Sequence, residues 1–156
     1  IAHDPDPTRT VNRTTATKLI RVPATPPPTP PTRPVPRAGV GARRRVEALV
    51  AQGWPVHLIA RAAQLSPSTL MPTHLSTSCS MATFTAVGVV FDQWRYQLGP
   101  SPRTARHAAR RGYLPWQAWD GRIDDPAATP DLSGLPAPLV AAWLARHRAT
   151  AGVAAA

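Results

Sequence analysis

Cysteine and glutamate are almost absent from this chain of 156 residues, and each scarcity excludes a class of function. Cys79 is the only cysteine, so no disulfide can form within the chain. Its neighbours give no metal-ligand spacing, and we expect a small buried or half-buried residue in a reducing cytoplasm. Glu47 is the only glutamate, which leaves paired-carboxylate catalysis to aspartates in a flexible segment. No nucleophile elbow is present either, so we expect no enzymatic activity.

Long apolar runs and clustered metal ligands are also missing. No stretch approaches the ~20 apolar residues that span a membrane, so we expect no membrane partner. The five histidines are scattered, and Asp120, Asp124 and Asp125 lack the alternation and closing glutamate of a calcium loop. We therefore predict no metal and no cofactor. The aspartates are interpreted as turn and cap residues, with one carboxylate forming an ion pair with Arg110 or Arg111.

Positive charge is abundant, and arginine supplies nearly all of it. The chain has 17 arginines and one lysine, a formal net charge of +10 and a pI near 11.6. Protein cations gain free energy by displacing counterions from nucleic-acid phosphates, so a polyanionic partner is expected. The codon bias of a GC-rich genome is an alternative origin for much of the arginine.

Proline divides the chain into segments. Many of the 20 prolines cluster between Pro23 and Pro36, where polyproline II is the natural conformation. The length suits one modest domain with tails. We predict the partial helical tail of a preceding unit over residues 1–22, a Pro-rich linker over 23–37, a helix-turn-helix domain over 38–125, and a turn-rich segment with a C-terminal helix over 126–156.

Apolar periodicity and capping residues predict helices and no strands. Gly39 and Gly41 open the first helix, and Ser80 and Ser101 cap later ones. Trp116 and Trp119 are expected to fold back over the core. The fold class is therefore all-α, a small helix-turn-helix bundle with a disordered Pro-rich N-terminal arm. The predicted helices cover residues 42–52, 55–63, 66–75, 80–98, 102–112 and 137–150.

A helix-turn-helix pattern lies between Trp54 and Leu75, in WPVHLIARAAQLSPSTLMPTHL. Two helices of this motif cross steeply because small and apolar residues interlock around a short turn. Ser66 would cap the second helix and aim its first turn at the major groove. The apolar contacts are assigned to Ile59, Ala60, Ala63, Leu65, Leu70 and Leu75.

Three departures from the pattern predict weak sequence specificity. Gln64 occupies the turn position where glycine is usual, and a positive φ there is strained. Pro72 inside the second helix costs ~3 kcal/mol or forces a kink. Bidentate base-reading side chains are missing from the second helix. The residues predicted to face the bases are Ser66, Ser68, Thr69, Thr73 and His74.

Arginines on both sides of the motif are predicted to contact DNA phosphates. The helix over 102–112 carries arginines that we place around its surface, so an ordinary solvated face is the alternative there. The predicted phosphate-binding residues are Arg43, Arg44, Arg45, Arg61, Arg103, Arg106, Arg110 and Arg111.

Several phrases resemble a family of actinobacterial and actinobacteriophage helix-turn-helix proteins. They are GARRRVEALVAQGWP (41–55), IARAAQLSPSTL (59–70) and GPSPRTARHAARRGY (99–113), followed by AWD and IDDP. The resemblance covers a little over half the chain and implies binding to double-stranded DNA, with a role in transcription regulation or in a phage. It also implies tandem units, so that Val11–Val22 would be the tail of a unit beginning before Ile1. Gln64, Pro72 and the linker depart from that pattern.

Other interpretations stay open at this stage. An ordinary helical hairpin, a non-DNA interaction module or a degenerate remnant would show the same apolar pattern. Arginine-driven RNA binding is a further alternative. The C-terminal helix is a candidate for self-association. A DNA-binding chain of this kind is expected in the cytoplasm, associated with the nucleoid.

Overall fold

The computed structural model describes residues 36–154, apart from the side chains of 36, 37, 73, 77, 78 and 150–154. Within that range every regular element of secondary structure is a helix, which confirms the all-α prediction. The predicted N-terminal tail and most of the linker lie outside the described residues. The elements are α2 (Pro36–Ala51), α3 (Val56–Ala62), η1 (Pro67–Leu70), α4 (Pro72–Ser78), α5 (Met81–Trp94), α6 (Pro102–Arg110), η2 (Trp116–Trp119) and α7 (Ala137–Ala154).

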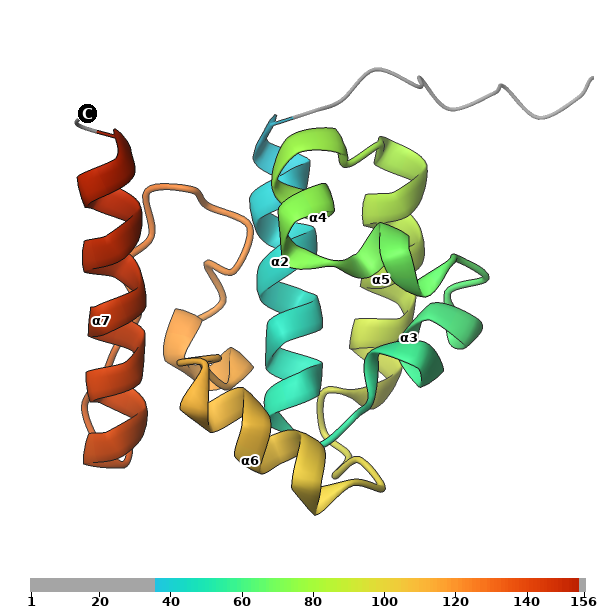
Figure 1. Ribbon diagram of the computed structural model, residues 1–156. Coiled ribbons are helices and arrows are strands. Elements are labelled where there is room, and N and C mark those ends of the chain that lie inside the picture. Colours follow the sequence, from blue (N-terminus) through green and yellow to red (C-terminus); the bar gives the residue numbers. More distant parts are fainter. Residues whose placement is uncertain (1–35, 155–156) are drawn as a thin grey trace, which may run out of the picture.

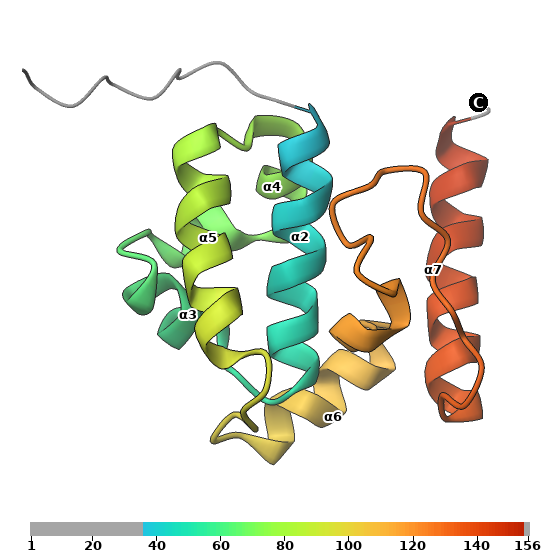
Figure 2. The ribbon, with the colours of Figure 1, turned by 180° about the vertical axis from the view of Figure 1, so that it is seen from behind.

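Helix α2 is the centre of the bundle. It lies between α7 on one side and α3, α4 and α5 on the other, with α6 crossing near its end (Figure 1, Figure 2). The glycines expected to open this helix lie inside it, because α2 begins at Pro36. A Cβ on Gly39 would meet the backbone carbonyl of Leu75, and one on Gly41 would meet the Asp124 carboxylate. These two glycines therefore allow close packing against α4 and the 120s segment.

Helix starts agree with the predicted caps. The hydroxyl of Ser80 accepts from the backbone N–H of Thr83 at 3.1 Å, and that of Ser101 accepts from Thr104 at 3.2 Å. Each hydroxyl satisfies one of the N–H groups that a helix leaves unpaired at its start. The predicted extension of α5 to residue 98 is wrong, since α5 ends at Trp94 and Leu98 is 88% exposed.

The helix-turn-helix geometry is present as far as the turn. Gln64 adopts a φ of 55°, the positive value predicted for this position. The N–H of Leu65 donates to the carbonyl of Ala60 at 2.9 Å and closes the turn. The apolar contacts are confirmed: Ile59, Ala60, Ala63, Leu70 and Leu75 are buried and Leu65 packs against them.

The predicted second helix is wrong. The chain forms the 3-10 turn η1, then an extended residue, Met71 (φ −64°, ψ 137°), and then the separate helix α4. Helical backbone angles are disfavoured in the residue before a proline. The helical conformation therefore ends at Leu70, and a new helix begins at Pro72. Pro72 occupies the first position of α4, where its missing N–H leaves no hydrogen bond unmade. The prediction that Pro72 lies inside a helix and destabilises it is therefore also wrong.

Replacing Pro72 with alanine is expected to lower the free energy of unfolding by less than about 1 kcal/mol. A proline at the first helical position suits the folded chain and restricts the unfolded one, so its removal is mildly destabilising. Urea unfolding followed by circular dichroism measures the change. A stabilisation of about 3 kcal/mol would show instead that this proline interrupts a continuous helix.

The segment between α6 and α7 closes the far side of α2. Tyr113, Leu114 and Trp119 are buried there, and the indole N–H of Trp116 donates to the carbonyl of Arg95 at 2.8 Å. The prediction that Trp116 and Trp119 fold back over the core is confirmed. Among the described helices, none combines the length and apolar character needed to cross a membrane.

Candidate nucleic-acid interface

The arginines of this protein divide into two sets, and the first set is used inside the fold. Arg44 is only 7% exposed. Its Nη1 donates to the carbonyls of Ile123 (3.2 Å) and Asp125 (2.6 Å), and its Nη2 donates to that of Ala128 (3.3 Å). Its guanidinium lies 3.8 Å from the centre of the Trp119 ring. Arg44 therefore fastens the 120s segment to α2.

Burial is the main influence on the pKa of Arg44. Burial first, and then the neighbouring positive charge of Arg43, lower the pKa of Arg44, while Asp125 and Glu47 oppose that shift. Arginine nevertheless stays protonated in proteins, so the guanidinium keeps its donors. All of its carbonyl acceptors belong to one short stretch of the chain.

Arg43 and Arg45 are also engaged by the protein. Nη2 of Arg45 lies 2.7 Å from the Asp124 carboxylate, and its guanidinium lies over the Phe84 ring at 4.7 Å. Arg43 donates to the Ser76 hydroxyl at 3.3 Å, and its Nε lies 3.8 Å from the carboxylate of Glu47. The phosphate contacts predicted for Arg44 and Arg45 stay a prediction, and the structure gives both guanidinium groups partners within the fold. Arg43, with a side chain 30% exposed, keeps only part of its surface for a ligand.

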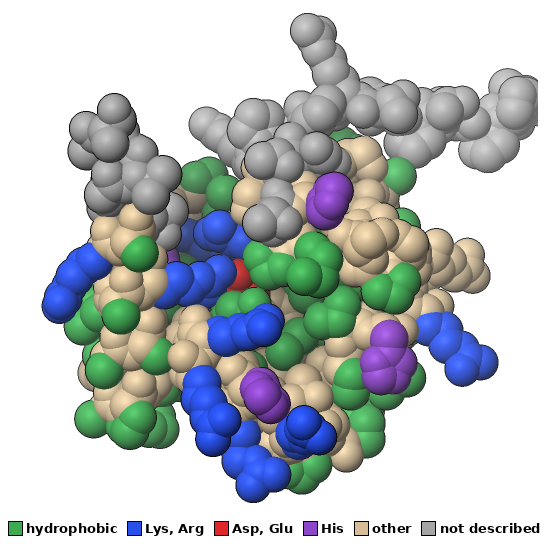
Figure 3. All heavy atoms as spheres, viewed as in Figure 1, with side chains coloured by type: hydrophobic (Ala, Val, Ile, Leu, Met, Phe, Trp, Pro, Cys, Tyr) green, Lys and Arg blue, Asp and Glu red, His purple; other side chains and the backbone are tan. Residues whose placement is uncertain are grey.

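The second set of arginines is exposed and centres on α6. Arg103, Arg106, His107 and Arg110 fall within an arc of about 100° around the helix axis, so they share one face. The expectation that the arginines spread around this helix is therefore wrong. Arg111, which follows as the C-cap, is exposed as well. Arginine side chains gather along this edge of the molecule (Figure 3).

No carboxylate of the described residues neutralises the α6 face. The ion pairs within residues 36–154 join Arg43, Arg45, Arg95, Arg122 and Arg146 to Glu47, Asp92, Asp124 and Asp125, and leave the α6 arginines unpaired. Like charges four residues apart on a helix destabilise it by about 0.2–0.5 kcal/mol per pair. The α6 face therefore carries an unrelieved repulsion that an anionic partner would remove.

A backbone crossing fixes the position of α6. The N–H of Gly99 donates to the carbonyl of Gln52 at 2.9 Å, and that of Ser101 donates to Gly53 at 3.1 Å. A Cβ on Gly99 would meet the backbone of Gly53, so only glycine allows this approach. The crossing ties the start of α6 to the end of α2, while Ala108 buries the inner side of the helix.

A shallow hollow of about 260 Å³ lies beside the α6 face. Arg103, His107 and Arg111, spaced four residues apart, line it together with the hydroxyl-bearing Thr104 and Tyr113. Guanidinium groups donate several hydrogen bonds to phosphate oxygens, and hydroxyl groups can add to them. The arrangement suits a phosphate group of a nucleic-acid backbone.

The residues predicted to face the bases are differently arranged. Ser66 caps η1 by accepting from the N–H of Thr69 at 3.4 Å, and its Oγ lies 2.7 Å from that of Ser68 and 3.0 Å from that of Thr69. These hydroxyls therefore bond to one another on a 3-10 turn. His74 is exposed on α4, and the side chain of Thr73 lies outside the described set.

Arg61, predicted to hold a phosphate, is exposed on α3 and has no hydrogen bond or ion pair to a described residue. It therefore stays available to an anionic partner. Its position on the first helix of the motif makes it the arginine that separates contact by the motif from contact by α6.

The aspartates act as turn residues, as predicted, but their partners differ from those expected. Asp124 pairs with Arg45 and Asp125 pairs with Arg122, both at 2.7 Å, so the pairing predicted with Arg110 or Arg111 is wrong. Hydrogen bonds from Arg122 and from a backbone N–H lower the pKa of Asp125.

The potential metal ligands of the described residues, Cys79 included, form no metal-binding cluster. Cys79 is buried, as predicted, and burial raises the pKa of its thiol. Across the described residues no group of three metal-ligating side chains comes together. The α6 face is therefore the strongest candidate site.

Comparison with known proteins identifies no relative. No protein-family model matches the chain, and no curated protein and no solved structure matches it. The resemblance to helix-turn-helix proteins of actinobacteria and their phages stays a prediction from sequence motifs.

Proposed function

We propose that this protein binds double-stranded DNA by its phosphate backbone, through the α6 face, with weak sequence specificity. The observation that carries the proposal is the division of the arginines. Arg44 and Arg45 bind acceptors within the fold, whereas the arginines of α6 are exposed and form no ion pair with a carboxylate of the described residues. Each phosphate that an arginine neutralises releases condensed counterions, which favours association.

The broken second half of the motif supports contact with the backbone over recognition of bases. A major-groove reader needs a continuous helix that presents several side chains to base edges. Here η1 and α4 are separated at Met71, and the serine and threonine hydroxyls of η1 bond to one another. We therefore propose nucleoid association without a defined operator, rather than operator-directed transcription regulation.

Replacing both Arg106 and Arg110 with glutamine is expected to weaken binding to a random-sequence duplex roughly 50-fold at 0.1 M salt. Two phosphate contacts contribute about 1.8 to the slope of log K against log salt, so that slope should fall by about this amount. Fluorescence anisotropy across a salt titration measures both quantities.

The matched control removes the same charge elsewhere by replacing Arg61 and Arg148 with glutamine. Both are exposed and lack a described partner, Arg61 on α3 and Arg148 on α7. The control should leave the salt slope within about half a unit of the parent, since neither residue lies on the α6 face. A larger loss from the control than from the α6 variant would place the contact outside the α6 face, at Arg61 on the helix-turn-helix motif or at Arg148 on α7.

A helical interaction module that does not bind DNA is the second candidate, and the break at Met71 favours it. Its contact would be α7, where Leu139, Val140 and Leu144 are only half-buried, and its result would be self-association. Sedimentation without DNA, together with absent duplex binding, would identify this function. Structured RNA that displaces duplex DNA from the α6 face would instead indicate an RNA partner.

A further inference from the structure

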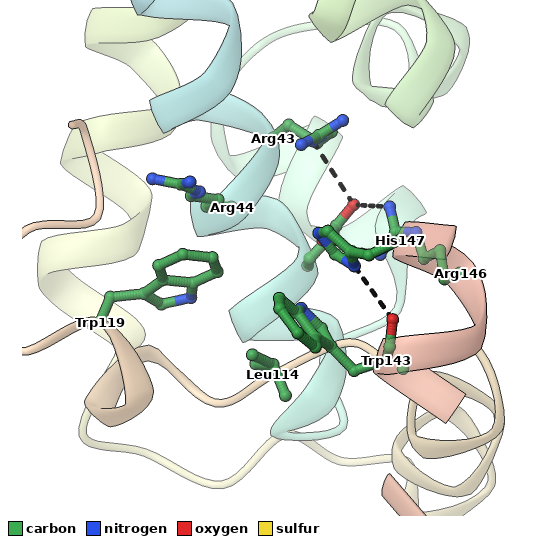
Figure 4. Close-up of a pocket in the computed structure, with 9 residues that line it drawn as sticks. Arg43, Arg44, Leu114, Trp119, Trp143, Arg146 and His147 are labelled. Atoms are coloured by element: carbon green, nitrogen blue, oxygen red, sulfur yellow. Dashed lines mark hydrogen bonds and ion pairs between the residues drawn. The ribbon is translucent and has the colours of Figure 1, made fainter. Parts of the chain in front are cut away.

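A partly enclosed cavity of about 140 Å³ lies between α2, the segment that follows α6, and α7, and its lining residues differ from those of the α6 hollow. Its lining includes Arg43 and Arg44 from α2, Trp119 from η2, and Trp143 and Arg146 from α7 (Figure 4). The residues come from three distant parts of the sequence, so the cavity exists only when α7 is seated.

Positive charge dominates the lining. The lining holds three arginines and one carboxylate, that of Glu47, which already accepts from Arg146 at 3.1 Å and 2.5 Å. The Nε atoms of Arg43 and Arg44 are buried and make no hydrogen bond. Arg44 is itself more than nine-tenths buried, and an unmade hydrogen bond of a buried charged group is costly. With three arginines and one carboxylate in its lining, the cavity favours an anionic ligand.

Flat apolar groups form part of the cavity wall, beside the polar groups of the arginines. Trp119 and Trp143 contribute indole rings, Leu114 adds an aliphatic surface, and the His147 ring stacks on Trp143 at 3.9 Å between centroids. The volume equals that of about four to five liquid waters, which is too small for a nucleotide and suits one ring with a charged substituent. We propose that this cavity binds a small planar carboxylate, a single-ring aromatic acid.

Benzoate is the probe that tests the proposal, with benzamide as its neutral isostere. Benzoate should bind the unmodified chain saturably in isothermal titration, and benzamide should bind roughly ten-fold more weakly or not at all, because it lacks the charge that guanidinium groups select. In a nitrogen–proton correlation spectrum, benzoate should move the indole signals of Trp119 and Trp143. The signal of Trp54, stacked on Trp94 at 4.1 Å outside this cavity, is the internal control.

A pair of variants locates the charge requirement. Arg43→Gln should weaken benzoate binding roughly ten-fold, whereas Arg148→Gln, an equal loss of charge from an exposed site on α7, should leave it unchanged. Equal effects of the two variants would overturn the proposal. So would benzamide binding as tightly as benzoate, inorganic phosphate competing equally well, or the absence of saturable binding. The ligand comparison uses the unmodified chain and does not depend on a variant folding, and it requires no DNA.

Discussion

Replacing Arg44 with alanine is expected to lower the free energy of unfolding by about 3–5 kcal/mol. The guanidinium supplies the donors for three backbone carbonyls, those of Ile123, Asp125 and Ala128, at 2.6–3.3 Å. Without it these acceptors stay in the interior and lack a hydrogen-bond donor, and each such group costs about 1–3 kcal/mol. The stacking of the guanidinium on Trp119 is lost in the same change. Because single domains are stable by only about 5–15 kcal/mol, much of the stability depends on this residue.

Two control variants separate the geometry of Arg44 from its charge. Arg44→Lys keeps the charge, but one ammonium cannot span carbonyls on three residues or lie flat on an indole, so about half of the loss should remain. Arg61→Ala removes an exposed arginine and should change stability by less than about 0.5 kcal/mol. Urea unfolding measures all three. A loss for Arg44→Ala no larger than that for Arg61→Ala would mean that water replaces the guanidinium.

Local chemistry made part of this fold predictable from the sequence. Ser80 and Ser101 cap helices because a hydroxyl there meets an N–H three residues on, which needs no tertiary information. The positive φ of Gln64 follows from the geometry of a tight turn between two apolar stretches. Burial of Leu70 and Leu75 follows from the same apolar pattern.

The roles of the α2 arginines were not predictable in this way. Arg43, Arg44 and Arg45 form a run that resembles a phosphate-binding patch, yet the acceptors of Arg44 lie 79 to 84 residues further along the chain. No periodicity within α2 signals that partnership. On α6, by contrast, helical spacing alone places Arg103, Arg106 and Arg110 on one face, and that signal was available.

The break at Met71 was also readable. Proline is common at the first position of a helix and disfavours helical geometry in the residue before it, so Met71-Pro72 can mark a new helix as well as a kink in an old one. The helix-turn-helix pattern favoured one continuous second helix with a kink at Pro72. Consequently the predicted base-facing surface spread over η1 and α4, which do not form a single helix.

Replacing Gly112 with alanine is expected to lower the free energy of unfolding by about 3–4 kcal/mol. Gly112 has a φ of +69°, where an L side chain is strained by about 1–2 kcal/mol. An added Cβ would also lie 2.5 Å from the backbone N and 2.6 Å from the Cα of Trp143, atoms that cannot rotate away. The methyl group would therefore push α7 off the end of α6, and overpacking of this kind costs about 1–3 kcal/mol.

Gly121 provides a control matched in conformation. Its φ is also +69°, but a Cβ there meets nothing within 4 Å, so Gly121→Ala should show the strain alone, about 1–2 kcal/mol. The difference between the two variants in urea unfolding isolates the contact with Trp143. Hydrogen exchange should locate that difference in α7, because Arg146 would lose its approach to Glu47 while α2 keeps its contacts with α4 and α5. Equal losses from both variants would show that α7 tolerates displacement. In that case the cavity that α7 closes would not be a fixed feature of the fold.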